Sequence, residues 1–595
     1  MNTAHYLLAT MGRKNVVTLL TIICVASMLD IVGIAIIFPF LQVVTQPDLV
    51  SNFFMGKGIS IVGYLTHEQI ILTLGVALIL FSALKTVVQS LLVRVQAKYL
   101  ARFTADNTNE IVSHVLNTRY AVFQETAVSE IAGTAYSNTV HATLALTALA
   151  QAFNEALILL LLLIVFFIFK PMLALGAVVA IVVTSYIIFQ LVIRRASQIG
   201  IAQSQIENVR YRLLFSIATA IRDIKIMGLE ELFDTRNRHI SRDYANLAWQ
   251  YNFNASLPRL LIEFIALLVI VVAALSVVLF KIPLDTAGPI LGMVAVATVR
   301  AVPAFSRLFN SISSFRSSAP FVTRLIELQN KLANSAVFRK SEKLTFNQKI
   351  ELKNISFLYG GKTILNKVNL HLKHGESIGI VGSSGAGKTT LLDLFTGLQP
   401  ASSGQFVCDG VSFDPFTSRA MQKIIGYVPQ SITLLDDTVA FNVSFEEQPD
   451  IELVMSALRM ANLQGMIYSL PEGIQTKVGE NGLRLSGGQR QRIGIARALY
   501  RLPEILVFDE ATSALDTLSE KELTAEIEKL RGKVSTIIVA HRLSTVIACD
   551  RIYVLSDGAI ECSGSHSELL QKSKIYKKLY ASQSYGDSEE SSVND

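Results

Sequence analysis

The feature that most constrains this chain is a series of long apolar runs within its first 330 residues. A helix of about 20 apolar residues crosses a bilayer, and a tilted helix uses more. About six runs satisfy this condition, the last being the weakest because it contains Arg300 and Pro303. They lie at residues 16–44, 68–96, 140–169, 172–193, 258–280 and 287–310. We therefore predict an α-helical six-span transmembrane domain over residues 1–330.

Composition indicates two unlike halves. A mean hydropathy of +0.44, with only 17% charged residues, is too apolar for a soluble enzyme of 595 residues. The net charge of +6 is modest, and the cations cluster in loops between apolar runs instead of forming a basic stripe. Nucleic acid is therefore not an expected partner. The four cysteines lack paired or metal-like spacing, which indicates reduced thiols.

The distribution of lysine and arginine predicts the orientation in the membrane. These residues gather between the second and third runs and between the fourth and fifth, whereas the opposite loops offer little more than Lys57, Lys170 and Lys281. Cytoplasmic loops carry the excess of such charges, so both termini should be cytoplasmic. The two long cytoplasmic loops are helical in pattern, and turns near 117–124 and 219–228 are candidates for coupling to the second half.

Several ionisable residues lie inside or near the ends of the spans, where a charge is unfavourable by about 2.5–3.5 kcal/mol. They are Asp30, Lys85, Glu155, Arg259, Glu263 and Arg300. Lys85, Arg259 and Arg300 belong to three different spans, and a cationic cavity would suit a phosphate or pyrophosphate headgroup. The alternative is mutual pairing, since Arg259 and Glu263 are spaced i,i+4. We keep the three cations as a hypothetical substrate site.

From about Lys349 the pattern changes to short strands, turns and helices. A buried-strand pattern at 377–381 leads into a glycine-rich segment, and a helical pattern follows at 391–395. The segment reads Gly382-Ser383-Ser384-Gly385-Ala386-Gly387-Lys388-Thr389-Thr390. Such a loop directs backbone N–H groups at the phosphates of a nucleotide. Lys388 can contact the β- and γ-phosphates, and the Thr389 hydroxyl can bind Mg²⁺.

A second apolar strand pattern, 505–508, ends in two carboxylates. Asp509 is the acid expected behind Mg²⁺, and Glu510 stands next to it, where it can polarise the attacking water. ATP and Mg²⁺ are therefore the expected cofactors, and ATP hydrolysis is the expected reaction.

About a hundred residues after the glycine-rich loop the chain reads Leu485-Ser486-Gly487-Gly488-Gln489. With the loop and the two carboxylates, this segment resembles the signature of ABC ATPases over nearly all of residues 349–583. The order of the two halves is similar to that of type 1 ABC exporters, which implies an α/β P-loop ABC ATPase domain after the membrane domain. The remaining boundaries are a linker at 331–348 and a disordered acidic tail at 584–595.

The resemblance implies further site residues. Tyr359 matches the aromatic residue that stacks on adenine, although a strand-end core aromatic is the alternative. Gln430 matches the glutamine that senses Mg²⁺ and water, and His541 matches the switch histidine at the γ-phosphate. Asp516 matches the loop that crosses the dimer interface. In this family Ser486 and Gly488 close on ATP held by the other subunit, which implies two chains. A homodimer is the simplest arrangement, and a heterodimer with a degenerate partner stays open.

The opening span and the separated cations are also similar to those of bacterial flippases of lipid-linked oligosaccharides. This similarity implies ATP-driven export of a polyprenyl-pyrophosphate-linked oligosaccharide or a related anionic glycolipid across a bacterial inner membrane, with membrane lipids as neighbours. An exporter of drugs, peptides or other lipids is the first alternative. A nucleotide-gated channel or receptor is the second, and Glu510 argues against it because a gate needs no general base.

Overall fold

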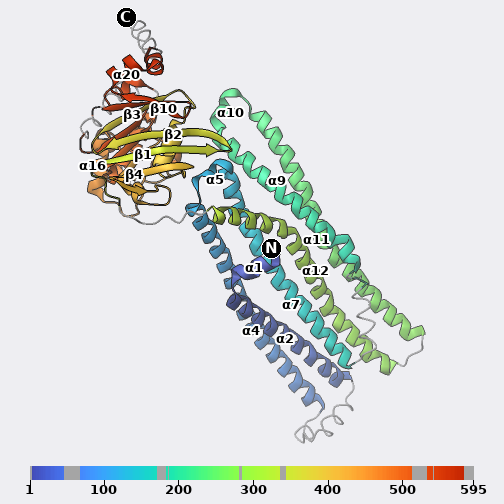
Figure 1. The fold of residues 1–595 in the computed structure, drawn as a ribbon. Coiled ribbons are helices and arrows are strands. Elements are labelled where there is room, and N and C mark those ends of the chain that lie inside the picture. The colour runs from blue at the N-terminus through green and yellow to red at the C-terminus, as the bar shows by residue number, and fades with distance from the viewer. Residues whose placement is uncertain are drawn as a thin grey trace. The chain divides into compact units, whose positions relative to one another are not determined.

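The computed structural model describes residues 3–45, 67–169, 183–184, 186–279, 284–335, 344–511, 525, 532–540 and 542–581. The tail predicted at 584–595 and most of the span predicted at 172–193 lie outside these residues. The chain divides into two compact units (Figure 1). One comprises Met1–Thr118 and Val122–Ala336, and the other Arg119–Ala121 and Val337–Asp595.

The described residues of the first unit are almost all helical. Its elements are α1 (Thr3–Met11), α2 (Arg13–Thr45), α4 (His67–Asn117), α5 (Tyr120–Glu125), α6 (Val128–Gly133), the π-helix η2 (Thr134–Asn138), α7 (Thr139–Phe169), the π-helix η3 (Phe189–Ile193), α9 (Arg194–Thr219), α10 (Ile221–Met227), α11 (Glu230–Leu279) and α12 (Leu284–Asn334). Helices suit a bilayer because they satisfy every backbone polar group internally.

Four stretches of the described helices are long and apolar enough to cross a membrane. They are Arg13–Gly33, Ile71–Asn117, Val128–Ile164 and Glu230–Val272. Helices α4 and α12 each have 51 residues, which corresponds to about 75 Å and is more than twice the thickness of the hydrocarbon core. Helix α4, which contains one of the four stretches, is therefore long enough to extend well beyond the bilayer.

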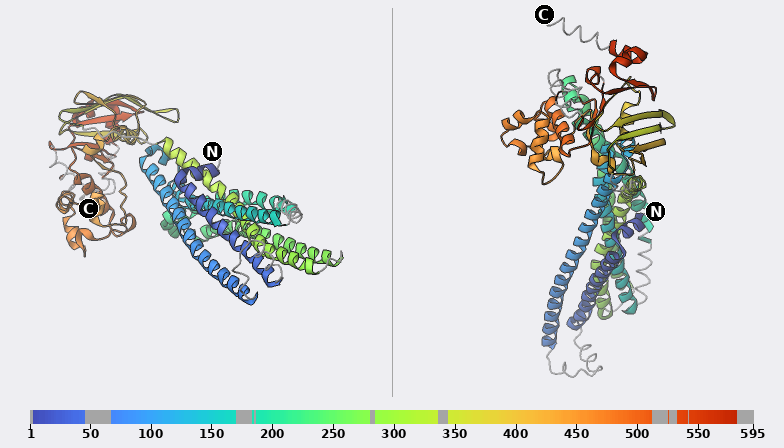
Figure 2. Two further views of the ribbon diagram at one scale, coloured as in Figure 1. Left: turned by 90° about the horizontal axis from the view of Figure 1, so that it is seen from below. Right: turned by 60° about the vertical axis from the view of Figure 1, so that its left-hand side comes forward.

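The membrane helices pack tightly in the part that α7 shares with α2, α4 and α12 (Figure 2). Leu7 of α1, Leu146 of α7 and Leu325 of α12 are fully buried in one cluster there. Elsewhere α9 crosses α12 at Gly200, where a Cβ atom would lie 2.3 Å from the carbonyl oxygen of Ser317. Glycine allows this close approach of two helix backbones.

The described strands of the second unit form two sheets. The antiparallel sheet has the order β2-β1-β4-β5, with β1 at Lys349–Tyr359, β2 at Lys362–Lys373, β4 at Ser403–Cys408 and β5 at Val411–Phe413. The larger sheet has the order β10-β9-β3-β8-β7-β6. Its strands are β3 (Ser377–Gly382), β6 (Ile425–Val428), β7 (Ile505–Asp509), β8 (Ser535–Val539), β9 (Arg551–Ser556) and β10 (Ala559–Gly564). β10 is antiparallel to β9, and every other pair of neighbouring strands in this sheet is parallel.

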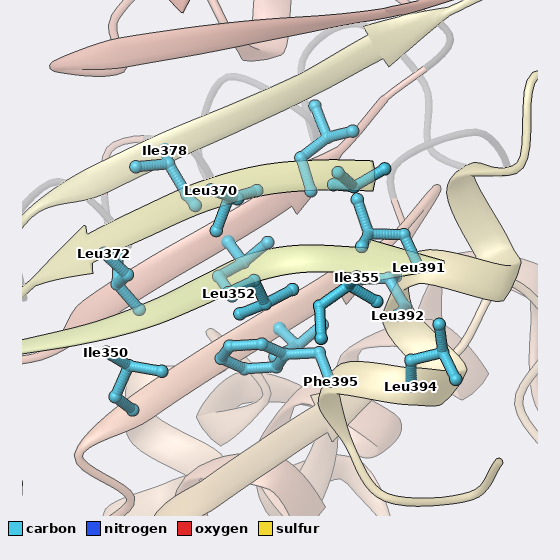
Figure 3. Packing of buried hydrophobic residues seen from close by; sticks show 14 of the residues in the cluster. Ile350, Leu352, Ile355, Leu370, Leu372, Ile378, Leu391, Leu392, Leu394 and Phe395 are labelled. Carbon is cyan, nitrogen blue, oxygen red and sulfur yellow. The ribbon is translucent and has the colours of Figure 1, made fainter. Parts of the chain in front are cut away.

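One hydrophobic core joins both sheets to the helix α13 (Lys388–Phe395). Ile350 and Leu372 of the antiparallel sheet, Ile378 of β3, and Leu391 and Phe395 of α13 are all buried in it (Figure 3). Because α13 begins at Lys388, burial of its apolar face holds the residues before it in place at the end of β3.

A second hydrophobic core lies among shorter helices that come between β6 and β7 in the sequence. These include α15 (Val439–Ser444), α16 (Ile451–Met460), α17 (Gln464–Ser469) and α18 (Gly487–Tyr500). Polar residues start several of them. The Asp450 carboxylate accepts hydrogen bonds from the N–H groups of Glu452 and Leu453, which caps α16.

We expect Gly200→Ala to destabilise the membrane unit by about 1–3 kcal/mol, because the new methyl group would overlap backbone atoms of α12 that cannot move independently. Thermal inactivation of the purified protein measures the effect. Gly75→Ala is the matched control, since its Cβ atom would lie 3.7 Å from the Phe40 ring, an ordinary contact. Equal stability of both variants would contradict the tight crossing.

Candidate functional site

The glycine-rich loop connects the buried strand β3 to α13, as the sequence predicts. Gly385 and Gly387 have φ angles of +79° and +100°, a left-handed conformation that favours glycine. A Cβ atom at Gly387 would also lie 2.8 Å from Leu365 Cδ2. The loop thus has the tight, side-chain-free backbone that phosphate binding requires.

Lys388 is buried at the first position of α13. Its Nζ donates hydrogen bonds to the carbonyl oxygens of Gly382 at 2.8 Å and Ser383 at 3.3 Å. Burial lowers the pKa of the Lys388 ammonium group, and the nearby carboxylates of Glu510 and Asp509 oppose that change. The charge of Lys388 therefore lies within its own loop, next to the exposed Thr389.

Asp509 ends β7 and is buried. The Tyr427 hydroxyl, on the neighbouring strand β6, donates a hydrogen bond to Asp509 Oδ2 at 2.9 Å. Burial raises the pKa of Asp509, Glu510 adds to the rise, and the Tyr427 bond and Lys388 oppose it. The acid predicted to stand behind Mg²⁺ is therefore oriented by a tyrosine that sequence reasoning did not assign.

Asp393 is a further acidic group near Asp509, and sequence reasoning did not assign it a role. It lies on α13, where burial and the neighbouring charge of Asp509 raise its pKa to about 6. Its only sequence signal was its place in the helix that follows the glycine-rich loop.

Glu510 follows β7 in a strained conformation, with φ at +51°. Its N–H donates to the Val539 carbonyl oxygen at 2.9 Å, which ties this residue to the end of β8. The side-chain amide Nε2 of Gln430 donates to Glu510 Oε2 at 2.6 Å. Lys388, Asp509, Glu510 and Gln430, which come from distant parts of the sequence, are thus brought together at one edge of the sheet.

The signature segment forms the start of α18. Ser486 is its N-cap: Ser486 Oγ accepts from the N–H of Gln489 at 3.2 Å, and Gln489 Oε1 accepts from the N–H of Ser486 at 2.8 Å. Gly487 is exposed, and a Cβ atom there would meet nothing within 4 Å. This open helix N-terminus is suited to an anion.

The other predicted ATP-site residues are less constrained. Tyr359 ends β1 with 45% of its surface exposed, so its ring is available for stacking. Ser383, Ser384, Ala386 and Thr390 belong to the loop and the first turn of α13. His541 and Asp516 lie outside the described residues.

In the membrane unit, Lys85 and Arg300 lie together, but Arg259 does not join them. Lys85 Nζ and Arg300 Nη2 contact the same oxygen, Asp30 Oδ1, at 2.7 and 2.5 Å. Arg259 instead pairs with Glu263 on its own helix at 2.7 Å.

A further charged pair was not foreseen. Arg307 donates two hydrogen bonds to the Glu155 carboxylate, at 2.7 and 3.0 Å. Arg307 follows Arg300 by seven residues, and this spacing, which puts both arginines on one face of α12, was the signal in the sequence that could have indicated it.

We expect Tyr427→Phe to move the acid limb of the ATPase pH profile to higher pH. The tyrosine bond favours the charged form of Asp509, so its loss raises the pKa of this carboxyl group further. At pH 7 kcat/KM should fall by about tenfold. Steady-state rates between pH 5 and 9 measure this. Tyr500→Phe removes a comparable hydroxyl–carboxylate bond, to Glu446, and should leave the profile unchanged; the same shift in both variants would refute the role of Tyr427.

Comparisons with known proteins agree with this geometry. Residues 365–513 match the family described as ABC transporter, and residues 32–285 match the ABC transporter transmembrane region. The ATP-dependent lipid A-core flippase of Burkholderia pseudomallei is 44% identical over 235 residues, which is 39% of each chain. That of Paraburkholderia xenovorans is 42% identical over 236 residues, 39% of this chain and 40% of the relative. The aligned part thus spans about two fifths of these relatives.

A solved structure with a similar fold has the same order of domains along the chain. The structure of a bacterial Atm1-family ABC exporter with ATP bound has a TM-score of 0.77 and 22% identity, and the match covers 96% of this chain and 98% of that one. This likeness concerns the fold. It confirms the prediction of a helical transmembrane domain followed by an α/β nucleotide-binding domain. With both of its characteristic regions joined in one polypeptide, the chain belongs to the ABC transporter family.

Proposed function

We propose that this chain is one half of an ATP-driven exporter that moves an anionic lipid across a membrane. The observation that carries the proposal is the convergence of Lys388, Asp509, Glu510 and Gln430 at one sheet edge, in a chain that also has membrane-spanning helices. A binding-only protein has no need of Glu510 beside the magnesium acid.

The site residues divide the work of hydrolysis. Backbone N–H groups of 382–390 bind the phosphates, and Lys388 neutralises their charge. Thr389, Gln430 and Asp509 offer hydroxyl, amide and carboxylate oxygens, the ligand types that Mg²⁺ prefers; the ion would neutralise charge on the transferred phosphoryl group. Glu510 polarises the water, and His541 contacts the γ-phosphate. Gln430 must release Glu510 before the carboxylate can orient water.

The signature supports a dimer. The side-chain hydrogen bonds of Ser486 and Gln489 join these two residues to each other. In our proposal these residues bind ATP held by a second copy of the chain, and Asp516 lies at that interface. Since this chain has a full set of elements, the simplest assembly is a homodimer with two equivalent sites.

The cargo proposal rests on the membrane charges and on the relatives. The related proteins are named for lipid A-core flipping, which supports a lipid cargo. Lys85 and Arg300 supply cations within the helical unit, which supports an anionic headgroup. We propose a polyprenyl-pyrophosphate-linked oligosaccharide as the cargo, in a bacterial inner membrane with the ATPase domain and both termini cytoplasmic.

The proposed conformational cycle couples these two activities. ATP binding would close two ATPase domains on each other, and hydrolysis would separate them again. Helix α4, which is long enough to extend beyond the bilayer, is suited to transmit this movement. The result would be alternate exposure of the cargo site to the two sides of the membrane.

We expect Glu510→Gln to lower vanadate-sensitive ATPase turnover by at least about 100-fold, because it removes the general base but little volume. ATP binding, measured with a fluorescent analogue, should persist. Glu447→Gln, at an exposed position, should retain wild-type turnover. A wild-type protein that binds ATP without turnover would favour the nucleotide-gated receptor instead.

Reconstitution tests the cargo. In liposomes, wild-type protein with ATP should translocate a polyprenyl-pyrophosphate-linked oligosaccharide, and Glu510→Gln should not. Lipid A-core, phosphatidylcholine and a cationic drug serve as competitors. Preferential movement of lipid A-core would retain the anionic lipid class and reject the polyprenyl cargo, whereas movement of the drug alone would reject both.

A further inference from the structure

Three helices meet at one carboxylate in the membrane unit. Asp30 of α2 accepts from Lys85 of α4 and Arg300 of α12 at the same oxygen. We call these three residues the Asp30 cluster. The side chains of Asp30 and Lys85 are 16% and 17% exposed, whereas that of Arg300 is 38% exposed. Arg300 is thus the more exposed of the two cations.

The local packing positions Lys85 for this contact. Gly33 lies one turn after Asp30 on α2, and a Cβ atom there would be 3.4 Å from Lys85 Nζ and 3.6 Å from its Cδ. The lysine stem therefore lies directly against the backbone of α2. A larger side chain at residue 33 would push the ammonium group away from Asp30.

The charges in the cluster do not balance. Two cations share one carboxylate, which leaves one positive charge uncompensated within the cluster. The neighbouring pair is balanced, because Arg307 makes two hydrogen bonds to Glu155, whose side chain is only 7% exposed. Arg259 and Glu263 balance each other as well. An unbalanced charge within a membrane domain is unfavourable unless an anion joins it.

We propose that Asp30 is the internal counter-ion of the cargo site and limits how tightly the site holds an anionic headgroup. This inference rests on the proposed function. Without cargo, the Asp30 carboxylate forms ion pairs with both Lys85 and Arg300. A phosphate on a lipid headgroup binds from the exposed Arg300 side and competes with Asp30 for the two donors. The carboxylate weakens the binding of the headgroup because it competes for both cations, so the site can release its cargo.

The direction in which Asp30→Asn changes headgroup affinity distinguishes competition by Asp30 from a purely structural role. If Asp30 competes with the headgroup, Asp30→Asn should tighten binding by about tenfold and should tighten diphosphate binding most. If Asp30 only holds the two cations in position, the same change should weaken binding. Lys85→Gln should weaken binding in both cases, which confirms that the probe occupies the cluster.

The experiment uses full-length protein in phosphatidylcholine nanodiscs with polyprenyl monophosphate, polyprenyl diphosphate and uncharged polyprenol as probes. Binding and half-maximal stimulation of ATP hydrolysis are both measured. Tighter binding of the two phosphates by Asp30→Asn, with polyprenol unchanged, is the expected result. Weaker or unchanged binding would overturn the inference. Glu207→Gln removes another half-buried carboxylate, on α9, and should leave headgroup affinity unaltered.

A second variant keeps the inference testable if Asp30→Asn alone fails to fold. The double variant Asp30→Asn/Lys85→Gln restores the net charge of the cluster and should bind the monophosphate within about threefold of wild type; a loss of about tenfold or more would overturn the inference. Failure of the proposed function looks different, because wild-type protein would then respond to none of the lipid probes. Equal competition by inorganic pyrophosphate would likewise reject the lipid cargo.

Discussion

The ATP site depends on the parallel pairing of β3, β8 and β7. Parallel strands end at the same edge of a sheet, so the loop after Gly382 and the carboxylate of Asp509 must face the same region. Both β3 and β7 pair with β8, through Ile380 and Asp509, which meet it at Val539. Strand β6 then supplies Tyr427 from the far side of β7. A slip of one residue would turn Asp509 to the opposite face of the sheet and remove it from the glycine-rich loop, so it could not hold Mg²⁺ there as we propose.

The signature helix is attached to the segment that carries Gln430. At Gly494 of α18 a Cβ atom would lie 2.3 Å from Ile432 Cδ1, so the two segments are in close contact. Arg497, also on α18, donates to the carbonyl oxygen of Thr433 at 3.1 Å. Any movement of α18 is therefore transmitted to the residues next to Gln430, whose amide holds Glu510. These contacts link α18 to Glu510, the proposed general base.

Local patterns made much of this structure predictable. The glycine-rich loop, Asp509 and Glu510 follow from a strand–loop–helix pattern and a strand end, and the pair Arg259–Glu263 follows from helical spacing. Contacts between distant residues could not be derived in the same way. Tyr427 reaches Asp509 across 82 residues only because β6 pairs with β7. Arg300 reaches Asp30 across 270 residues, which depends on how each helix is rotated about its axis. Hydropathy predicts that a helix spans the membrane, but it does not predict the direction of each charge.

The Asp30 cluster also has a consequence for how the chain enters the membrane during synthesis. Asp30 emerges from the ribosome first, and Lys85 follows on the next long helix, so α2 and α4 can partition into lipid as a neutral pair. Arg300 is made more than 200 residues later and finds its partner already in place. Asp30 thus neutralises the early charge of Lys85, and the late Arg300 adds the positive charge that is in excess. The helical unit then acquires the excess positive charge of the Asp30 cluster only when α12 is made.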